Sequence, residues 1–197
     1  KAVASQQPSH GVLVPIAAMS TGRAAHTATA LPDGRVLVAG GFARENSAQA
    51  AEVYQPGAGR FSPLPPMITT RHSHTATLLR DGRVLIAGGY GEGTATLATA
   101  ELFNPATNTF TPTGSLVAAR ANHVTVLLKN GKVLIAGGLG PGWEFLSSAE
   151  IYDPLTGTFS GGNVTNRTQF TNNKIPTDRI NPVAKAVMAY WGAPKHG

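Results

Sequence analysis

The sequence predicts an all-β fold of three successive four-stranded antiparallel units, and two observations carry this prediction. A pair of glycines recurs at spacings of 48 and 49 residues, as Gly40-Gly41, Gly88-Gly89 and Gly137-Gly138. A hairpin signal and an apolar run precede each pair, over 33–39, 81–87 and 130–136. The composition agrees, because 23 Gly and 14 Pro with only 13% charged residues favour short strands and tight turns over long amphipathic helices.

Each unit contains four segments with strand character, which the first unit illustrates. Residues 26–31 alternate between polar and apolar side chains. Asp33-Gly34 follows shortly after them and is a strong two-residue hairpin signal. Residues 35–39 form an apolar run, which predicts a strand buried on both faces, and the glycine pair after it provides backbone freedom. Residues 51–54 predict a third strand. Residues 60–63 predict a fourth at the outer edge, where Pro63 is tolerated.

Further landmarks recur once per unit. An Arg-x-x-His step occurs as Arg23/His26, Arg71/His74 and Arg120/His123, and a Glu-x-aromatic step begins at Glu52, Glu101 and Glu150. This pattern resembles the kelch repeat, particularly its bacterial form with an Asp-Gly-Arg-Val-Leu core before Ala-Gly-Gly. The family usually carries Trp at the positions of Phe61, Phe110 and Phe159. The resemblance covers roughly residues 11–160 and implies kelch-type β-propeller blades.

The predicted organisation is a lead-in, three blades and a tail. The lead-in, 1–18, includes an outer strand over 10–17 from a preceding or closing blade, and the blades occupy 19–66, 67–115 and 116–160. Propellers close with about four to eight blades. Three blades therefore indicate either half of a homodimeric six-bladed ring or an incomplete ring from a longer propeller, and the unusual tail favours the second interpretation.

The tail, 161–197, breaks the repeat and carries five basic residues against one Asp. Asn181 as N-cap and Pro182 at the first helical position predict a short helix near 182–191. Residues 173–191 resemble a stretch of Oar-like TonB-dependent outer-membrane receptors. This resemblance implies a bacterial, extracytoplasmic protein, either secreted or in the cell envelope.

Charge and cysteine content narrow the function classes. The net charge is +6 and the basic residues of the tail are dispersed, so nucleic acid is not an expected partner. No apolar stretch is long enough to span a membrane. The chain has no cysteine and therefore no thiolate metal site, and no cofactor is expected. Galactose oxidase-like enzymes use a kelch-type propeller, but their copper site requires a cysteine-linked tyrosine.

The repeated ionisable residues have a structural and a functional interpretation. His26, His74 and His123 would stand on consecutive blades and are weak candidates for a transition-metal site, or each supports its own strand through hydrogen bonds. The loop arginines, Arg23, Arg71 and Arg120, are candidates for binding a carboxylate or a sulfated sugar. Their structural alternative is an ion pair with the repeated glutamates or bonds to loop carbonyls.

Residues that occur in one unit only are better candidates for recognition. His72 has no counterpart in the other units, and the loop after the third glycine pair carries Trp143 and Phe145. Variable loops on a rigid scaffold commonly carry binding sites. Alternatively, the two aromatic residues pack on a neighbouring blade.

The leading functional hypothesis is a non-enzymatic propeller module that binds a protein or a glycan through its loop face, because no catalytic motif is present. One alternative is a fragment of a carbohydrate-active enzyme whose catalytic residues lie on missing blades. Another is a structural subunit that self-assembles through its open blade edges, as a homodimer or a larger assembly.

Overall fold

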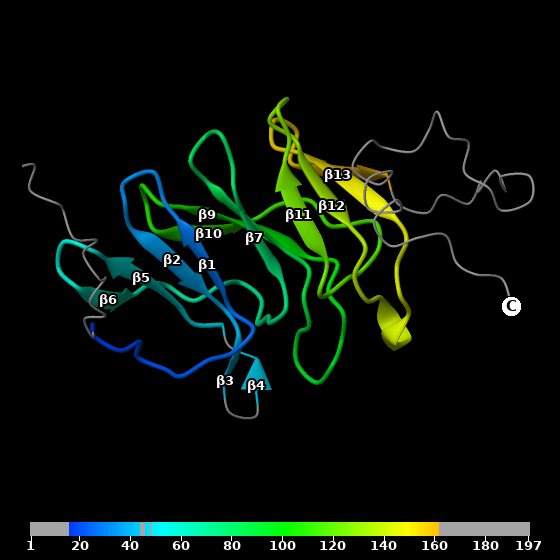
Figure 1. Ribbon diagram of the computed structural model, residues 1–197. Coiled ribbons are helices and arrows are strands. Elements are labelled where there is room, and N and C mark those ends of the chain that lie inside the picture. Colours follow the sequence, from blue (N-terminus) through cyan, green and yellow to red (C-terminus); the bar gives the residue numbers. More distant parts are fainter. Residues whose placement is uncertain (1–15, 44–45, 48, 162–197) are drawn as a thin grey trace, which may run out of the picture. The chain divides into compact units, whose positions relative to one another are not determined.

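The computed structural model describes residues 16–43, 46–47 and 49–161, and the regular secondary structure of this part is almost entirely β-strand (Figure 1). The predicted helix near 182–191 lies outside the described residues. So does most of the predicted outer strand over 10–17, although Ile16 and Ala17 are described and are not in a strand. No helix in the described ranges has the length and apolarity needed to cross a membrane.

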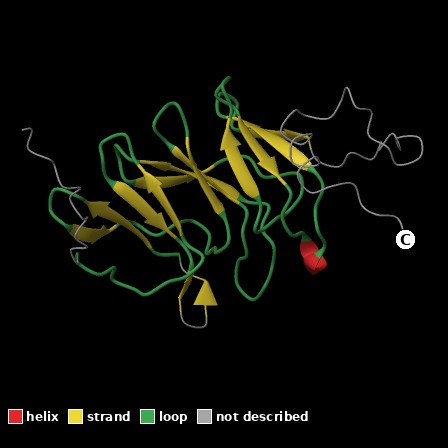
Figure 2. Ribbon diagram, viewed as in Figure 1, coloured by secondary structure: helices red, strands yellow, loops and turns green. Residues whose placement is uncertain are grey.

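Three four-stranded antiparallel sheets confirm the predicted fold class, one sheet for each repeat unit (Figures 1 and 2). The first unit contains β1 (Thr27–Ala30), β2 (Val36–Ala39), β5 (Ala51–Gln55) and β6 (Arg60–Pro63). The second contains β7 (Thr75–Leu78), β8 (Val84–Ala87), β9 (Ala100–Asn104) and β10 (Thr109–Pro112). The third contains β11 (Val124–Leu127), β12 (Val133–Ala136), β13 (Ala149–Asp153) and β14 (Thr158–Gly161).

Neighbours in each sheet are also neighbours in sequence, apart from one small insertion. The short strands β3 (Phe42–Ala43) and β4 (Asn46–Ser47) form a separate two-stranded ribbon between β2 and β5. The only helix among the described residues is a single 3-10 turn, η1 (Pro141–Trp143), drawn red in Figure 2. The first strand of the second unit, β7, lies against both β1 and β11.

The second strand of the middle unit is buried on both faces, as its apolar run predicts. Val84 and Ile86 belong to a core cluster shared with the first unit, whereas Leu85 and Ala87 belong to a cluster shared with the third. All four side chains are at most 1% exposed. Packing between units therefore supplies most of the core, since one sheet alone cannot cover both of its faces.

The glycine pair permits the units to approach each other closely. Gly88 has φ +62°, and a Cβ atom at this position would lie 2.4 Å from the carbonyl oxygen of Arg120 in the next unit. The adjacent Gly89 donates its N–H to that same carbonyl at 2.9 Å. A side chain at Gly88 would therefore push the second and third units apart.

Candidate functional site

The repeated arginines lie inside their units, and this corrects the hypothesis that they face a ligand. Arg23, Arg71 and Arg120 have side chains that are 0% exposed. They lie 2.9, 3.0 and 2.7 Å from the carboxylates of Glu52, Glu101 and Glu150, respectively. The structural alternative that the sequence left open, an ion pair inside each unit, accounts for them.

The guanidinium group of Arg71 shows how many of its donors are bonded within its own unit. Its Nη1 donates to the carbonyl oxygens of Gly88 at 2.7 Å and Thr99 at 3.1 Å, while its Nε and Nη2 donate to Glu101. Burial lowers the pKa of Arg71, and the nearby Glu101 carboxylate opposes this shift. The arginine therefore fastens the loop before β7 to the strands behind it, with little capacity left for a ligand.

Two of the repeated histidines, His74 and His123, join neighbouring units through hydrogen bonds. The Nε2 atom of His74 shares a 2.9 Å hydrogen bond with Thr27 Oγ1, and that of His123 shares a 2.8 Å bond with Thr75 Oγ1. The Nδ1 atoms of these two rings and of His26 are buried and have no partner in the described part of the chain. No group of three potential metal ligands occurs there either, so the suggested three-histidine centre is not formed.

Burial keeps the imidazoles of the junctions uncharged. Desolvation, reinforced by the charge of Arg71, lowers the pKa of His74 to about 3. Desolvation and Arg120 lower the pKa of His123 to about 4. Both rings are therefore neutral near pH 7, which suits a structural hydrogen bond.

An aromatic row crosses all three units at the end of the strands that carries the glycine pairs. We use this name for Phe42, His72, Tyr90 and Trp143, which follow one another in that order in space. The ring centroids of Phe42 and His72 are 5.5 Å apart, those of His72 and Tyr90 are 5.3 Å apart, and those of Tyr90 and Trp143 are 5.5 Å apart. These separations are typical of interacting aromatic rings.

Backbone pairing fixes the positions of the row's first three members. Phe42 and Tyr90 each directly follow a glycine pair. The N–H and C=O groups of Phe42 pair with those of Ala24, and those of Tyr90 pair in the same way with those of His72. His72 therefore lies beside Tyr90 because it occupies the position that Ala24 and Ala121 occupy in the other units.

A short, hydrogen-bonded loop presents Trp143. Gly140 donates to the carbonyl of Glu144 at 2.9 Å, and Leu146 donates to that of Gly138 at 2.9 Å, so the loop closes on itself. Trp143 has φ +66°, an unfavourable conformation for a residue with a side chain. Such strain, held in place by surrounding bonds, is frequent at binding sites.

The surface of the row is aromatic and uncharged at its centre. Phe42 is 43% exposed and Trp143 is 61% exposed, whereas Tyr90 lies beneath them at 5%. Burial lowers the pKa of His72, so its ring is neutral near pH 7. Phe145, two residues beyond Trp143, is 92% exposed and enlarges the apolar surface at this end. The rings of the row therefore offer flat apolar faces to a ligand, and none of the four rings carries a charge near pH 7.

Three candidates from the sequence, His72, Trp143 and Phe145, lie in or next to the row. The structure brings His72 and Trp143 together through Tyr90, and places Phe145 in the same loop as Trp143. Phe42 and Tyr90 were missed, although an aromatic residue directly after two of the three glycine pairs is a visible signal. The buried Tyr90 hydroxyl finds no hydrogen-bond partner among the described residues.

Comparisons with solved structures support a β-propeller fold. A fungal alcohol oxidase of the AA5 family, solved with copper, aligns over 75% of this chain with a TM-score of 0.59 and 17% identity. The protein YjhT aligns over 77% with a TM-score of 0.62 and 18% identity. The chain spans 31% of the oxidase and 54% of YjhT. At these identities the likeness concerns the fold alone, and the three sheets are β-propeller-like blades.

Comparisons at the level of sequence give one partial match. A family model described as an outer membrane beta barrel domain matches residues 125–197, which is less than half of the chain. The match begins in β11 and so includes most of the third sheet, whose register equals that of the other two. It also includes 173–191, the segment that resembles outer-membrane receptors. No curated protein matches the chain.

Proposed function

We propose that this chain is a kelch-type propeller module that binds glycans through the aromatic row, without catalysing a reaction. The observation that carries the proposal is the continuous row of four rings across three units, with Trp143 exposed at one end. Pyranose rings have apolar C–H faces that stack on aromatic rings, while their hydroxyl groups stay hydrated. An uncharged aromatic surface suits that chemistry better than it suits an ionic ligand.

The ionisable residues of the repeat support binding over catalysis. The arginines and glutamates that recur in each unit are paired with each other and buried. The histidines His74 and His123 are neutral and bonded to threonines. General acid–base chemistry requires a titratable group that reaches the substrate, and these side chains are committed to the fold.

We also propose a location in the cell envelope, on the extracytoplasmic side, of a bacterium. Two features support it: the match of residues 125–197 to an outer membrane domain, and the similarity of 173–191 to outer-membrane receptors. A glycan-binding module in that location would meet polysaccharides of the cell surface or of the surroundings.

The test uses the fluorescence of Trp143 in the full chain. The sequence has two Trp residues, so Trp191→Phe leaves Trp143 as the single tryptophan reporter. A panel of immobilised glycans identifies a ligand, which is then titrated while Trp143 emission is recorded. We expect saturable changes in emission, and in the Trp143→Ala variant a loss of affinity of about 30-fold, as for an aromatic hot spot.

The control is Val126→Ala, which truncates an apolar side chain of similar exposure, 54%, on β11 outside the row. This variant should bind with unchanged affinity. Undiminished binding by Trp143→Ala, measured by calorimetry on a chain shown to be folded, would contradict the proposed site. A ligand that proves to be a protein would contradict the glycan assignment.

A further inference from the structure

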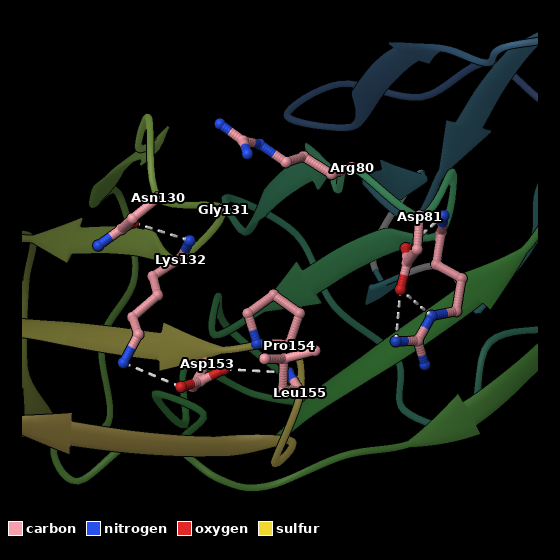
Figure 3. Close-up of a pocket in the computed structure, with 9 residues that line it drawn as sticks. Arg80, Asp81, Asn130, Gly131, Lys132, Asp153, Pro154 and Leu155 are labelled. Atoms are coloured by element: carbon pink, nitrogen blue, oxygen red, sulfur yellow. Dashed lines mark hydrogen bonds and ion pairs between the residues drawn. The ribbon is translucent and has the colours of Figure 1, made fainter.

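A hollow lies at the end of the strands opposite the aromatic row, where the hairpins before β8 and β12 approach the turn between β13 and β14. Its volume is about 460 Å³, and it includes Arg80, Arg83 and Lys132 with Asp81 and Asp153. Figure 3 shows Asp81 on one side and the ion pair of Lys132 with Asp153 on the other, with Pro154 and Leu155 between them. The hollow is thus lined by charge at its sides and by apolar groups at its centre.

The equivalent place between the first and second units is occupied by an arginine. Arg35 donates to Asp33 of its own hairpin at 2.7 Å. It also reaches the β9–β10 turn of the second unit, where it donates to Asn108 Oδ1 at 3.0 Å and to the carbonyl of Pro105 at 2.7 Å. The first junction therefore uses this guanidinium group to hold two units together.

The second junction lacks that arrangement, and one of the two acceptors has no counterpart there. Arg83 is the counterpart of Arg35, but the counterpart of Asn108 is Gly157, which has no side chain to accept a bond. Arg83 instead donates from Nε and Nη2 to the same oxygen of Asp81, at 2.8 and 2.6 Å. Within the described part of the chain, no hydrogen bond links it to the β13–β14 turn, and the side chain is 34% exposed.

The charges leave an excess of one positive unit, because three basic side chains face two carboxylates. Both carboxylates are already paired, Asp81 with Arg83 and Asp153 with Lys132 at 2.9 Å. Burial acts to raise the pKa of Asp81, but the bonds to Arg83 outweigh it and the pKa is lowered. The bond to Lys132 lowers the pKa of Asp153, so both carboxylates are ionised near pH 7. Arg83 retains donors at Nη1 for a further acceptor.

We propose that this hollow binds a carboxylate attached to an apolar body, with Arg83 as the main donor and Pro154 and Leu155 as the apolar wall. A guanidinium group and a carboxylate match in geometry, since both are planar and form paired hydrogen bonds. Leu155 is 96% exposed, so it is free to cover a ligand. The ligand carboxylate accepts from Arg83 as Asn108 Oδ1 accepts from Arg35 in the first junction.

The test uses benzoate as the probe and benzamide as its uncharged counterpart. In the full chain labelled with ¹⁵N, benzoate should shift the signals of the Arg83 Nε–H and of the Leu155 and Gly131 amides in a saturable manner. Benzamide at equal concentrations should not. Arg83→Gln should weaken benzoate binding about tenfold or more, because it removes a charged donor.

A second variant, Gly157→Asn, leaves Arg83 in place. Gly157 has φ +69° and Asn108 has φ +55°, so asparagine is compatible with this backbone. The new amide oxygen should engage Arg83 as Asn108 engages Arg35, and benzoate should bind at least fivefold more weakly. Arg35→Gln, the matched change in the first unit, should leave benzoate binding unchanged. Equal shifts with benzoate and benzamide, or full benzoate affinity in both Arg83→Gln and Gly157→Asn, would overturn the proposal.

Discussion

The same repeat positions meet different surroundings at the junction between the second and third units and on the far face of the third unit. At the junction, Gly88 lies against the Arg120 carbonyl and Thr75 bonds to His123. On the far face, a Cβ atom on Gly137 would meet nothing closer than 3.6 Å. Val124, which is 64% exposed, stands at the repeat position where Thr27 and Thr75 each share a hydrogen bond with a histidine.

The glycine and the threonine differ in whether they persist on a face that no described unit covers. The third unit also has the glycine pair, although no other described unit packs on Gly137, whereas valine stands at the position of the threonine. A further unit of the same kind would place its histidine against this valine, without the hydrogen bond found at both described junctions. The far face is thus not equivalent to a junction face. If a second copy closed the ring on this face, its His26 would meet Val124 and would lack the hydrogen bond to threonine.

We expect the largest loss of stability from a substitution in the buried ion pair of the middle unit, between Arg71 and Glu101. Glu101→Gln leaves the Arg71 charge without its counter-ion at 0% exposure and should lower the free energy of unfolding by about 3–5 kcal/mol. The surface counterpart, Asp81→Asn, removes a half-exposed partner of Arg83 and should cost about 1 kcal/mol or less. Urea unfolding followed by circular dichroism compares the two, and equal losses would contradict the assignment.

Acidification should weaken the junctions. An unfolded histidine gains a proton as the pH falls through about 6.5, whereas folded His123 and His74 stay neutral down to about pH 4 and 3. Their contribution is therefore complete above pH 6.5 and is lost as the pH falls toward the folded values. Between pH 7 and pH 5 we expect a loss of about 1–2 kcal/mol per histidine.

Urea midpoints measured at several pH values test this dependence. The His123→Gln variant should be less stable at pH 7, but its stability should fall less steeply with decreasing pH. A wild-type midpoint that stays constant from pH 7 to pH 5 would show that these rings are not buried in the neutral form.

Alanine at the two equivalent glycines distinguishes the junction from the far face. Gly88→Ala should cost about 2 kcal/mol or more beyond Gly137→Ala, because only Gly88 would force a neighbouring backbone to move. Both variants carry the same penalty of about 1–2 kcal/mol for positive φ, which cancels in the comparison. Thermal unfolding of the pair gives the difference directly, and equal melting temperatures would mean that the units are not packed as described.

The smallest effect concerns the hydroxyl group at the junction. Thr75→Val removes the partner of His123 Nε2 and should cost about 1–2 kcal/mol. Val124→Thr makes the reverse change on the far face and should alter stability by no more than about 0.5 kcal/mol. If both substitutions have the same effect, the threonine–histidine bond does not stabilise the junction.

The sequence predicted the fold more completely than the site, for a physical reason. Hairpin residues, apolar runs and glycine pairs act locally and recur in each unit, so the strands could be identified from their pattern. Whether Arg71 faces a ligand or Glu101 depends on contacts 30 residues apart in the chain, and the repeat is compatible with both. Recurrence itself indicated the structural role, since every unit needs the same internal ion pair.

The site residues that were predicted are those that break the repeat. His72 is the only histidine at its repeat position, and Trp143 and Phe145 lie in a loop that differs between units, whereas Phe42 and Tyr90 share a repeat position and did not stand out. The convergence of Tyr90 with Trp143 depends on how two loops from different units meet, which no local pattern specifies. The hollow beside Arg83 was missed for a similar reason, because three turns from two different units meet around it.

The most direct test of the central claim, that the aromatic row is one ligand site spanning three units, is the glycan affinity of Phe42→Ala. Phe42 lies at the opposite end of the row from Trp143, and 43% of it is exposed. We predict a loss of affinity of about tenfold with no large change in the urea midpoint, as expected when one aromatic stacking partner is removed. Unchanged affinity in Phe42→Ala, with binding abolished in Trp143→Ala, would confine the site to the third unit and contradict a continuous row.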